Sequence, residues 1–204
     1  ERYRDASQTF DRLVTRSSVG PFTQEADLLR AYAWGRIATA EPTRAHEEHY
    51  VAALAAHRDR YAGTATASEA TWMLATFEDG RDQWTRALPL YLELTDDAAR
   101  GAQSLTRAAI LYERVLDRLR QANQPRDAWE DQAVEELAYR VRKFPENPAD
   151  WSADQGDVCV RLVRIVLAHR EHPYAEADRL LAAVLSAGAA QQRAAERDGA
   201  GLAE

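Results

Sequence analysis

The chain has 204 residues, 46% of them hydrophobic, and carries a formal net charge of −7 with an isoelectric point near 5.3. This acidic balance argues against nucleic acid and anionic membrane surfaces as partners, because both attract basic protein faces. No apolar run reaches the length of about 18 residues that a membrane-spanning helix needs. The only cysteine, Cys159, excludes an intramolecular disulfide and a four-cysteine zinc site, and its apolar neighbours predict a buried side chain.

Helix-favouring residues dominate the composition, and apolar side chains recur at helical spacing, which together predict an all-α fold of about nine helices. A Thr66-Ala67-Ser68-Glu69 capping box is expected to open a helix that ends near Gly80. Pro89 should kink or shorten its helix because proline removes one N–H donor, and Asp96-Asp97 is expected to cap the next helix. Apart from the helix ending near Gly80, the expected helices cover residues 1–16, 22–40, 42–61, 82–95, 97–122, 126–144, 149–170 and 173–187.

The expected helices follow one another without a clear domain boundary. The best linker is Phe144-Pro145-Glu146-Asn147-Pro148, but helical segments continue on both sides of it. We therefore expect one helical-repeat domain over residues 1–187 and a frayed or disordered tail over residues 188–204.

Two further expectations concern the origin of the chain. It begins without Met, so we expect a fragment or processed form of a longer protein. Abundant Arg and Ala with a single Lys indicate a GC-rich bacterial genome. The cysteine usage fits either cytoplasm or periplasm.

One side-chain pattern recurs: a large residue, Ala three positions later, a large residue four later and an aliphatic residue three later. These offsets place all four side chains on one helix face, where the small Ala lets a neighbouring helix approach closely. The complete copies are Tyr3-Ala6-Phe10-Leu13, Trp84-Ala87-Tyr91-Leu94, Leu105-Ala108-Tyr112-Val115 and Tyr174-Ala177-Leu181-Val184, and a partial copy is Tyr50-Ala53-His57.

Ala53 and Ala87 lie 34 residues apart, which is the period of one known repeat family. The hairpin 68–95 resembles the tetratricopeptide repeat, although its first aromatic residue is displaced by one position and the closing Pro is absent. The resemblance covers about residues 42–95 and is architectural elsewhere. It implies an α-solenoid of antiparallel hairpins in a right-handed superhelix, whose curved surface binds proteins or peptides. The signature positions are occupied by Leu74, Ala75, Trp84, Ala87 and Tyr91.

The resemblance also implies which residues contact a partner. The concave-facing positions of the first helix in this hairpin are Glu69, Trp72, Thr76 and Asp79. Family members that clamp a peptide's C-terminal carboxylate use Lys and Asn there, so Trp72 and Thr76 argue against that ligand mode. Trp72 has two interpretations, either an aromatic anchor for a partner or a residue packed between hairpins.

No catalytic, cofactor or metal site is expected. His46 and His49 share a helix face, but their spacing is not that of a zinc protease, and a solvated face is the favoured interpretation. Phosphate loops, nucleophile elbows and Cys/His pairs are absent from the sequence. The leading hypothesis is therefore a protein-interaction scaffold, with a metal-binding or enzymatic bundle and a purely structural spacer as alternatives.

A set of acidic residues is expected on a solvated helix surface, and the alternative is that they form a negatively charged groove for a basic partner. They are Glu47, Glu48, Glu78, Asp79, Asp82, Glu135 and Glu136.

Overall fold

The computed structural model describes residues 2–16, 21–169 and 177–189, and within these ranges all regular secondary structure is helical. This confirms the all-α prediction. The described chain falls into two compact units, residues 1–100 and residues 101–204. None of the helices in the described ranges combines the length and apolarity needed to span a bilayer.

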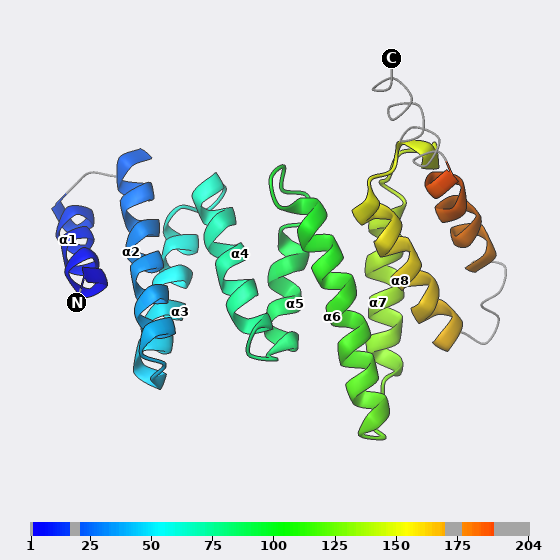
Figure 1. Cartoon of the computed structure of the whole chain (residues 1–204), viewed down its shortest axis with the longest axis horizontal. Helices are drawn as coiled ribbons and strands as arrows, with labels where there is room; N and C mark the ends of the chain where they lie inside the picture. Colours follow the sequence, from blue (N-terminus) through cyan, green and yellow to red (C-terminus); the bar gives the residue numbers. More distant parts are fainter. Residues whose placement is uncertain (1, 17–20, 170–176, 190–204) are drawn as a thin grey trace, which may run out of the picture. The chain divides into compact units, whose positions relative to one another are not determined.

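The first unit is a series of helices in which each packs against the next (Figure 1). In addition, α2 contacts α4 directly, so two helices that are not consecutive in the chain face one another. This contact between alternate helices is the geometry of stacked hairpins. The helices are α1 (Arg2–Arg16), α2 (Pro21–Ala40), α3 (Arg44–Arg60), α4 (Ala65–Asp79) and α5 (Trp84–Glu93).

The start of α4 differs from the expected capping box. The N-cap is Thr64, whose hydroxyl accepts a hydrogen bond from the backbone N–H of Ala67 at 3.3 Å. Gly63 precedes it with φ of 78°, a left-handed conformation that glycine adopts without steric cost, and so turns the chain into the helix. Thr66 therefore lies inside the first turn, and the prediction of Thr66 as the cap was wrong.

Pro89 lies inside α5, as expected, and α5 has only ten residues. The following turn is organised by Asp97, whose carboxylate accepts hydrogen bonds from the N–H groups of Ala99 at 2.9 Å and Arg100 at 2.8 Å. The next helix begins only at Gly101. Asp97 thus caps the turn that leads into this helix, and the expected start at residue 97 was four residues too early.

In the second unit, α8 packs against both α6 and α7. The expected linker around Phe144 is folded within this unit. The Phe144 ring lies edge-on to the Trp151 ring, with 5.5 Å between their centroids, and the Trp151 indole N–H donates a hydrogen bond to the Pro145 carbonyl at 2.8 Å. The elements are α6 (Gly101–Gln121), α7 (Asp127–Val141), the short 3₁₀ helix η1 (Pro148–Asp150) and α8 (Ala153–His169), followed by helical residues 177–189.

The expected domain limits stay predictions. The division between the compact units falls after Arg100, and the segment 144–148 lies inside the second unit. Residues 188 and 189 of the expected tail belong to the helical segment, and residues 190–204 lie outside the described residues.

The recurring side-chain pattern describes the core of three helices. Ala53, Ala87 and Ala108 are buried in α3, α5 and α6. Tyr91 and Tyr112, four positions after an alanine, are also buried, which confirms that the small residue admits a neighbouring helix beside large side chains.

In the other two copies of the pattern, some of the large side chains are exposed. In α1, Tyr3 and Leu13 are both 43% exposed, so this copy does not form a continuous buried face. In the last copy Tyr174 lies outside the described residues, and Leu180 is buried while Leu181 is exposed.

Candidate functional site

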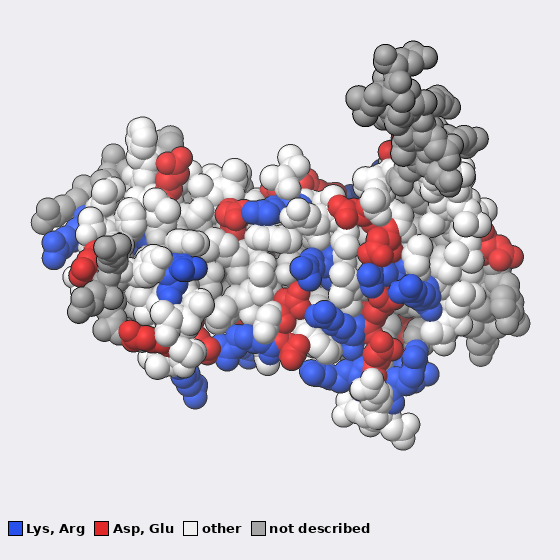
Figure 2. Space-filling model, viewed as in Figure 1, with Lys and Arg blue, Asp and Glu red and all other residues white. Residues whose placement is uncertain are grey.

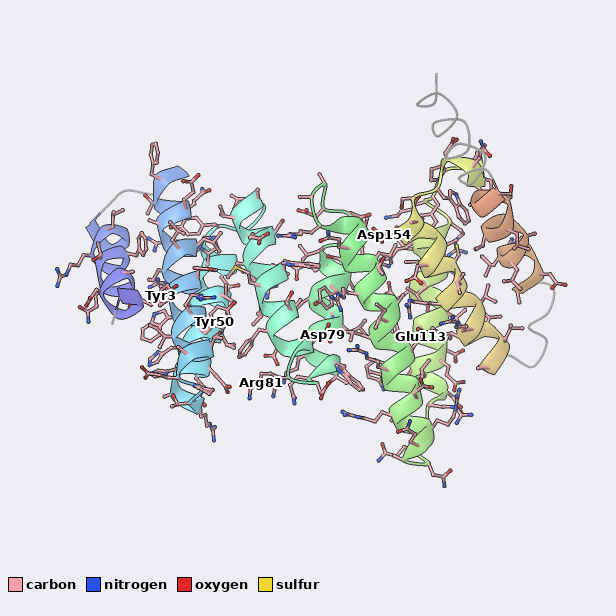
Figure 3. All side chains as sticks on the ribbon, in the orientation of Figure 1. Tyr3, Tyr50, Asp79, Arg81, Glu113 and Asp154 are labelled. Carbon is pink, nitrogen blue, oxygen red and sulfur yellow. The ribbon has the colours of Figure 1, made fainter. Side chains whose placement is uncertain are left out.

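The partner-contact residues expected on α4 do not all lie on the same surface. Glu69, Trp72 and Thr76 line a cavity of about 370 Å³ between α2 and α4. Asp79 does not line it: the side chain is buried, and the Tyr91 hydroxyl approaches its carboxylate at 3.5 Å (Figure 3). The remaining lining residues are Tyr32, Gly35, Arg36 and Thr39 of α2, Tyr50 of α3, and Met73 and Phe77 of α4.

Helical spacing explains why these residues converge. The lining positions on α4 are 69, then 72 and 73, then 76 and 77, and those on α2 are 32, then 35 and 36, then 39, so both sets recur once per helical turn. Side chains at these spacings share one helix face. Because α2 and α4 pack together, the two faces close on a common space.

Trp72 is held from two sides. Its ring lies edge-on to Tyr91 at 5.4 Å, and the Arg100 guanidinium lies 4.8 Å from the indole centroid. Arg100 also donates to both carboxylate oxygens of Glu69, at 2.8 to 3.0 Å. Trp72 therefore packs against α5 and lines the cavity at the same time, and its role as an aromatic anchor for a partner stays a prediction.

The floor of the cavity is formed around Tyr50. A Cβ placed on Gly35 would lie 2.8 Å from Tyr50 Cε2, so the absence of a side chain at Gly35 makes room for the ring. Phe77 meets the same ring edge-on at 5.2 Å. Burial, together with the nearby Tyr32, raises the pKa of Tyr50 to about 12, so its hydroxyl stays neutral at physiological pH.

The α2 side of the cavity extends onto an exposed apolar row. Tyr32 is 50% exposed, and Phe22 and Leu29 on the same helix are 85% and 49% exposed. Arg36 lies 5.5 Å from the Tyr3 ring centroid, and a hydrogen bond with Tyr3 raises the pKa of Arg36 above its ordinary value (Figure 3). The cavity thus joins aromatic surface to one cationic and one anionic side chain.

A buried polar cluster was missed by the sequence analysis. His57 is fully buried in α3, and its Nδ1 lies 3.0 Å from an Asp27 carboxylate oxygen on α2. Arg30 Nη2 lies 2.8 Å from the other oxygen of Asp27. The available signal was the partial repeat copy, which has a polar His at the position where the other copies have Phe, Tyr or Leu.

The histidines considered for a metal have other surroundings. His46 Nδ1 lies 2.9 Å from the Glu41 carbonyl oxygen, and His49 stacks on Trp34 with 4.8 Å between centroids. A search of the described residues finds no group of three or more His, Cys, Asp or Glu side chains placed to hold a metal ion. Cys159 is buried as predicted, and burial raises its pKa to about 12.

Two of the acidic residues expected on a solvated surface are buried, and two others form ion pairs while partly exposed. Glu78 and Asp79 are both buried at the end of α4. Glu47 pairs with Arg81, and Glu136 pairs with Arg140. Glu48, Asp82 and Glu135 are exposed, as a solvated surface requires, so the expectation was wrong only for Glu78 and Asp79.

Comparison with known proteins identifies the fold. No family model matches the chain, and no curated protein matches it. A solved structure of a putative kinesin light chain with nearly identical TPR-like repeats, from Podospora anserina, superposes with a TM-score of 0.51 at 17% sequence identity. The match covers 94% of this chain and 89% of that chain. The protein therefore has a TPR-like helical-repeat fold, which confirms the resemblance at the level of architecture.

Proposed function

We propose that the protein is a protein-interaction scaffold that binds a peptide segment of its partner in the groove between α2 and α4. TPR-like folds typically serve protein interaction, because stacked hairpins present an extended curved surface. The observation that carries the proposal is the aromatic cavity lined by Tyr32, Trp72 and Phe77 beside an exposed apolar row on α2.

The groove has the features of a side-chain pocket. A cavity of about 370 Å³ lies within the size range of small-ligand sites and accommodates one large apolar side chain. Aromatic residues that are already held in place bind with little loss of conformational entropy. Arg36 and Glu69 are the two charged lining residues, and their opposite charges favour an apolar segment over a strongly charged one. Asp79 is left out of the proposed contact surface because it is buried.

The test uses selection and matched variants. Peptides selected from a random phage-displayed library against the intact chain are measured by fluorescence polarisation. Tyr32→Ala removes an exposed aromatic contact, and Thr76→Trp fills the cavity from an exposed position. Tyr139→Ala is the control, because Tyr139 and Tyr32 are both 50% exposed and Tyr139 lies on α7. Trp72→Ala is less suitable, because Trp72 also packs against Tyr91.

We expect Tyr32→Ala and Thr76→Trp each to weaken binding about five- to thirty-fold, the range of interface hot spots. Tyr139→Ala should leave binding unchanged. Equal affinities in all three variants would contradict the groove as the binding site. A selection that yields no peptide dependent on the groove would favour the structural spacer.

The remaining expectations stay predictions. Absence of catalysis fits this fold, and the alternative of an enzymatic or metal-binding bundle has no supporting cluster in the described residues. A bacterial origin, the compartment and the oligomeric state are likewise open to direct measurement.

A further inference from the structure

Another cavity of the first unit, of about 500 Å³, lies between α3, the end of α4 and the start of α5. These helices pack in order, α3 against α4 and α4 against α5. The cavity shares Phe77 of α4 with the aromatic groove, but the rest of its lining is different and mostly polar. The other lining residues are Arg44, Glu47, Glu48, Val51 and Ala52 of α3, Glu78 of α4, Arg81 and Gln83 of the following turn, and Arg86 of α5.

The charges in this polar cavity balance one another. Three arginines accompany three glutamates in the lining, and Figure 2 shows basic and acidic side chains likewise interspersed on the face of the first unit that it draws. Arg44 pairs with Glu48 at 2.7 Å, and Arg81 pairs with Glu47. Because the lining has no net charge, it favours neither a strongly acidic nor a strongly basic ligand.

Glu78 is the buried charge of this cavity. The residue is only 8% exposed and lies in the last turn of α4. None of the residues that the structure describes gives its carboxylate a hydrogen bond or an ion pair. A carboxylate taken out of water is normally paired, because burial of an uncompensated charge is costly. A carboxylate that is more than nine-tenths buried, lacks such a partner and lines a cavity indicates a site for a positively charged group.

The turn between α4 and α5 fixes the position of Glu78. Its backbone carbonyl accepts hydrogen bonds from the N–H groups of Arg81 at 3.2 Å and Gln83 at 2.9 Å. Within the turn, Asp82 has φ of 57°, a left-handed conformation that is uncommon outside glycine. Arg81, which follows α4 in Figure 3, also lies 5.3 Å from the Phe77 ring centroid. The carboxylate is thus presented by a backbone that is already held, which lowers the entropic cost of binding a ligand.

The opposite charge is supplied by Arg86. This residue lies in the first turn of α5 and is exposed. Its guanidinium forms no ion pair with any residue in the described part of the chain. Glu78 and Arg86 line the same cavity without pairing with each other. A ligand between them therefore meets one buried negative charge and one exposed positive charge.

We propose that this polar cavity binds a free α-amino acid with an apolar side chain. The ammonium group of the ligand donates to the Glu78 carboxylate, and its carboxylate accepts from the Arg86 guanidinium, since hydrogen bonds between ionised groups are the strong ones. The apolar side chain packs against Phe77, Val51 and Ala52, the apolar part of the lining. The volume of about 500 Å³ lies in the range of small-ligand sites.

Other cationic ligands use fewer of these features. A metal ion needs several ligating side chains, and the described residues hold no group of three His, Cys, Asp or Glu placed for that purpose. A polyamine, or the lysine side chain of a partner, carries positive charge alone and meets three arginines in the lining. A free amino acid presents both charges on neighbouring groups and has no net charge, as the cavity requires.

The experiment is isothermal titration calorimetry of the full chain with L-leucine, L-methionine and L-phenylalanine. For each amino acid that binds, the matched analogues are the amine without its carboxylate and the acid without its ammonium group. For leucine these are 3-methylbutylamine and 4-methylpentanoate. Spermidine and N-acetyl-lysine amide are the purely cationic probes.

The variants remove one charge each and keep the size of the side chain. Glu78→Gln and Arg86→Gln act in the cavity. Their controls lie in the second unit: Glu130→Gln changes another buried glutamate, 9% exposed on α7, and Arg142→Gln changes another exposed arginine, at the end of α7.

We expect saturable binding of at least one of the three amino acids, and binding of its two analogues at least about ten-fold weaker. Glu78→Gln should weaken binding about ten- to hundred-fold, because a hydrogen bond between charged groups is lost. Arg86→Gln should weaken it about two- to five-fold, as for an exposed ion pair. The controls in the second unit should leave binding unchanged, and so should Tyr32→Ala, which separates this site from the aromatic groove.

Unfolding in urea distinguishes a binding role of Glu78 from a structural one. Glu78→Gln should leave the urea midpoint unchanged or raise it, because the substitution removes an unpaired buried charge. A lowered midpoint would show that the carboxylate is already compensated within the chain, which overturns the proposal.

Three results of the titrations would also overturn it. The first is the absence of saturable binding for all three amino acids. The second is an amine, an acid, spermidine or N-acetyl-lysine amide that binds as tightly as the amino acid, which would indicate a site for a single charge. The third is an effect of Glu130→Gln as large as that of Glu78→Gln.

Discussion

The buried contact between Asp27 and His57 offers a sharp test of what holds α2 to α3. The Asp27 side chain is 2% exposed and the His57 side chain is fully buried, so water cannot replace the contact when one partner is removed. Asp27→Ala leaves the His57 imidazole with one fewer partner and also removes the carboxylate beside Arg30. We expect this substitution to destabilise the protein more than the loss of any exposed ion pair.

The magnitude has two parts. Leaving a buried polar group unsatisfied costs about 1–3 kcal/mol. Losing the contact with Arg30, whose side chain is 24% exposed, adds about 0.2–1 kcal/mol. The expected total of about 1–4 kcal/mol is a large share of the usual 5–15 kcal/mol stability of a protein.

The assay is equilibrium urea unfolding followed by circular dichroism at helical wavelengths. Glu48→Ala is the matched control, because Glu48 pairs with Arg44 at 2.7 Å but both side chains are exposed. It should cost less than about 0.5 kcal/mol. A double-mutant cycle of Asp27→Ala with His57→Ala should give a coupling energy of about 0.5–3 kcal/mol. Equal costs for Asp27→Ala and Glu48→Ala, or strict additivity in the cycle, would refute the reasoning.

Three other predictions concern separate sites. Gly35→Ala should lower the free energy of unfolding by about 1–2 kcal/mol in urea, because overpacking against the Tyr50 ring exceeds the gain in helix propensity. Hydrogen bonds from Ser68 and the backbone hold the pKa of Asp97 below its ordinary value, so its carboxylate stabilises the fold above about pH 4. That contribution is lost as pH falls through the folded pKa, and the difference in urea midpoint between the parent and Asp97→Asn should shrink between pH 6 and pH 3. Cys159, buried and with a pKa raised to about 12, should react with a disulfide reagent at pH 8 only after urea is added; rapid labelling of the native chain would contradict its burial.

The sequence by itself determined the helical character of the chain and much of its core. Helix periodicity and propensity act over three or four residues, so they are readable without tertiary contacts. The same local spacing identified Ala87 and Ala108 as sites of close helix packing, and both are buried. The resemblance to the tetratricopeptide repeat implied that Glu69, Trp72 and Thr76 share one face of their helix, and all three line one cavity.

Tertiary structure decided which of these faces are covered. Asp79 follows the same helical spacing as Thr76, but α5 brings Tyr91 beside it and buries it. Local spacing cannot distinguish the two residues, because their exposure depends on a helix that begins only at Trp84.

Pairing between distant residues was also beyond the sequence. Asp27 meets His57 across 30 positions, and Glu113 meets Arg161 across 48. Such contacts depend on the angle and register at which two helices pack. Both are set by how many side chains fit together along the interface, and no local sequence pattern encodes them. The aromatic groove therefore depends on the packing of α2 against α4, which the sequence alone does not specify.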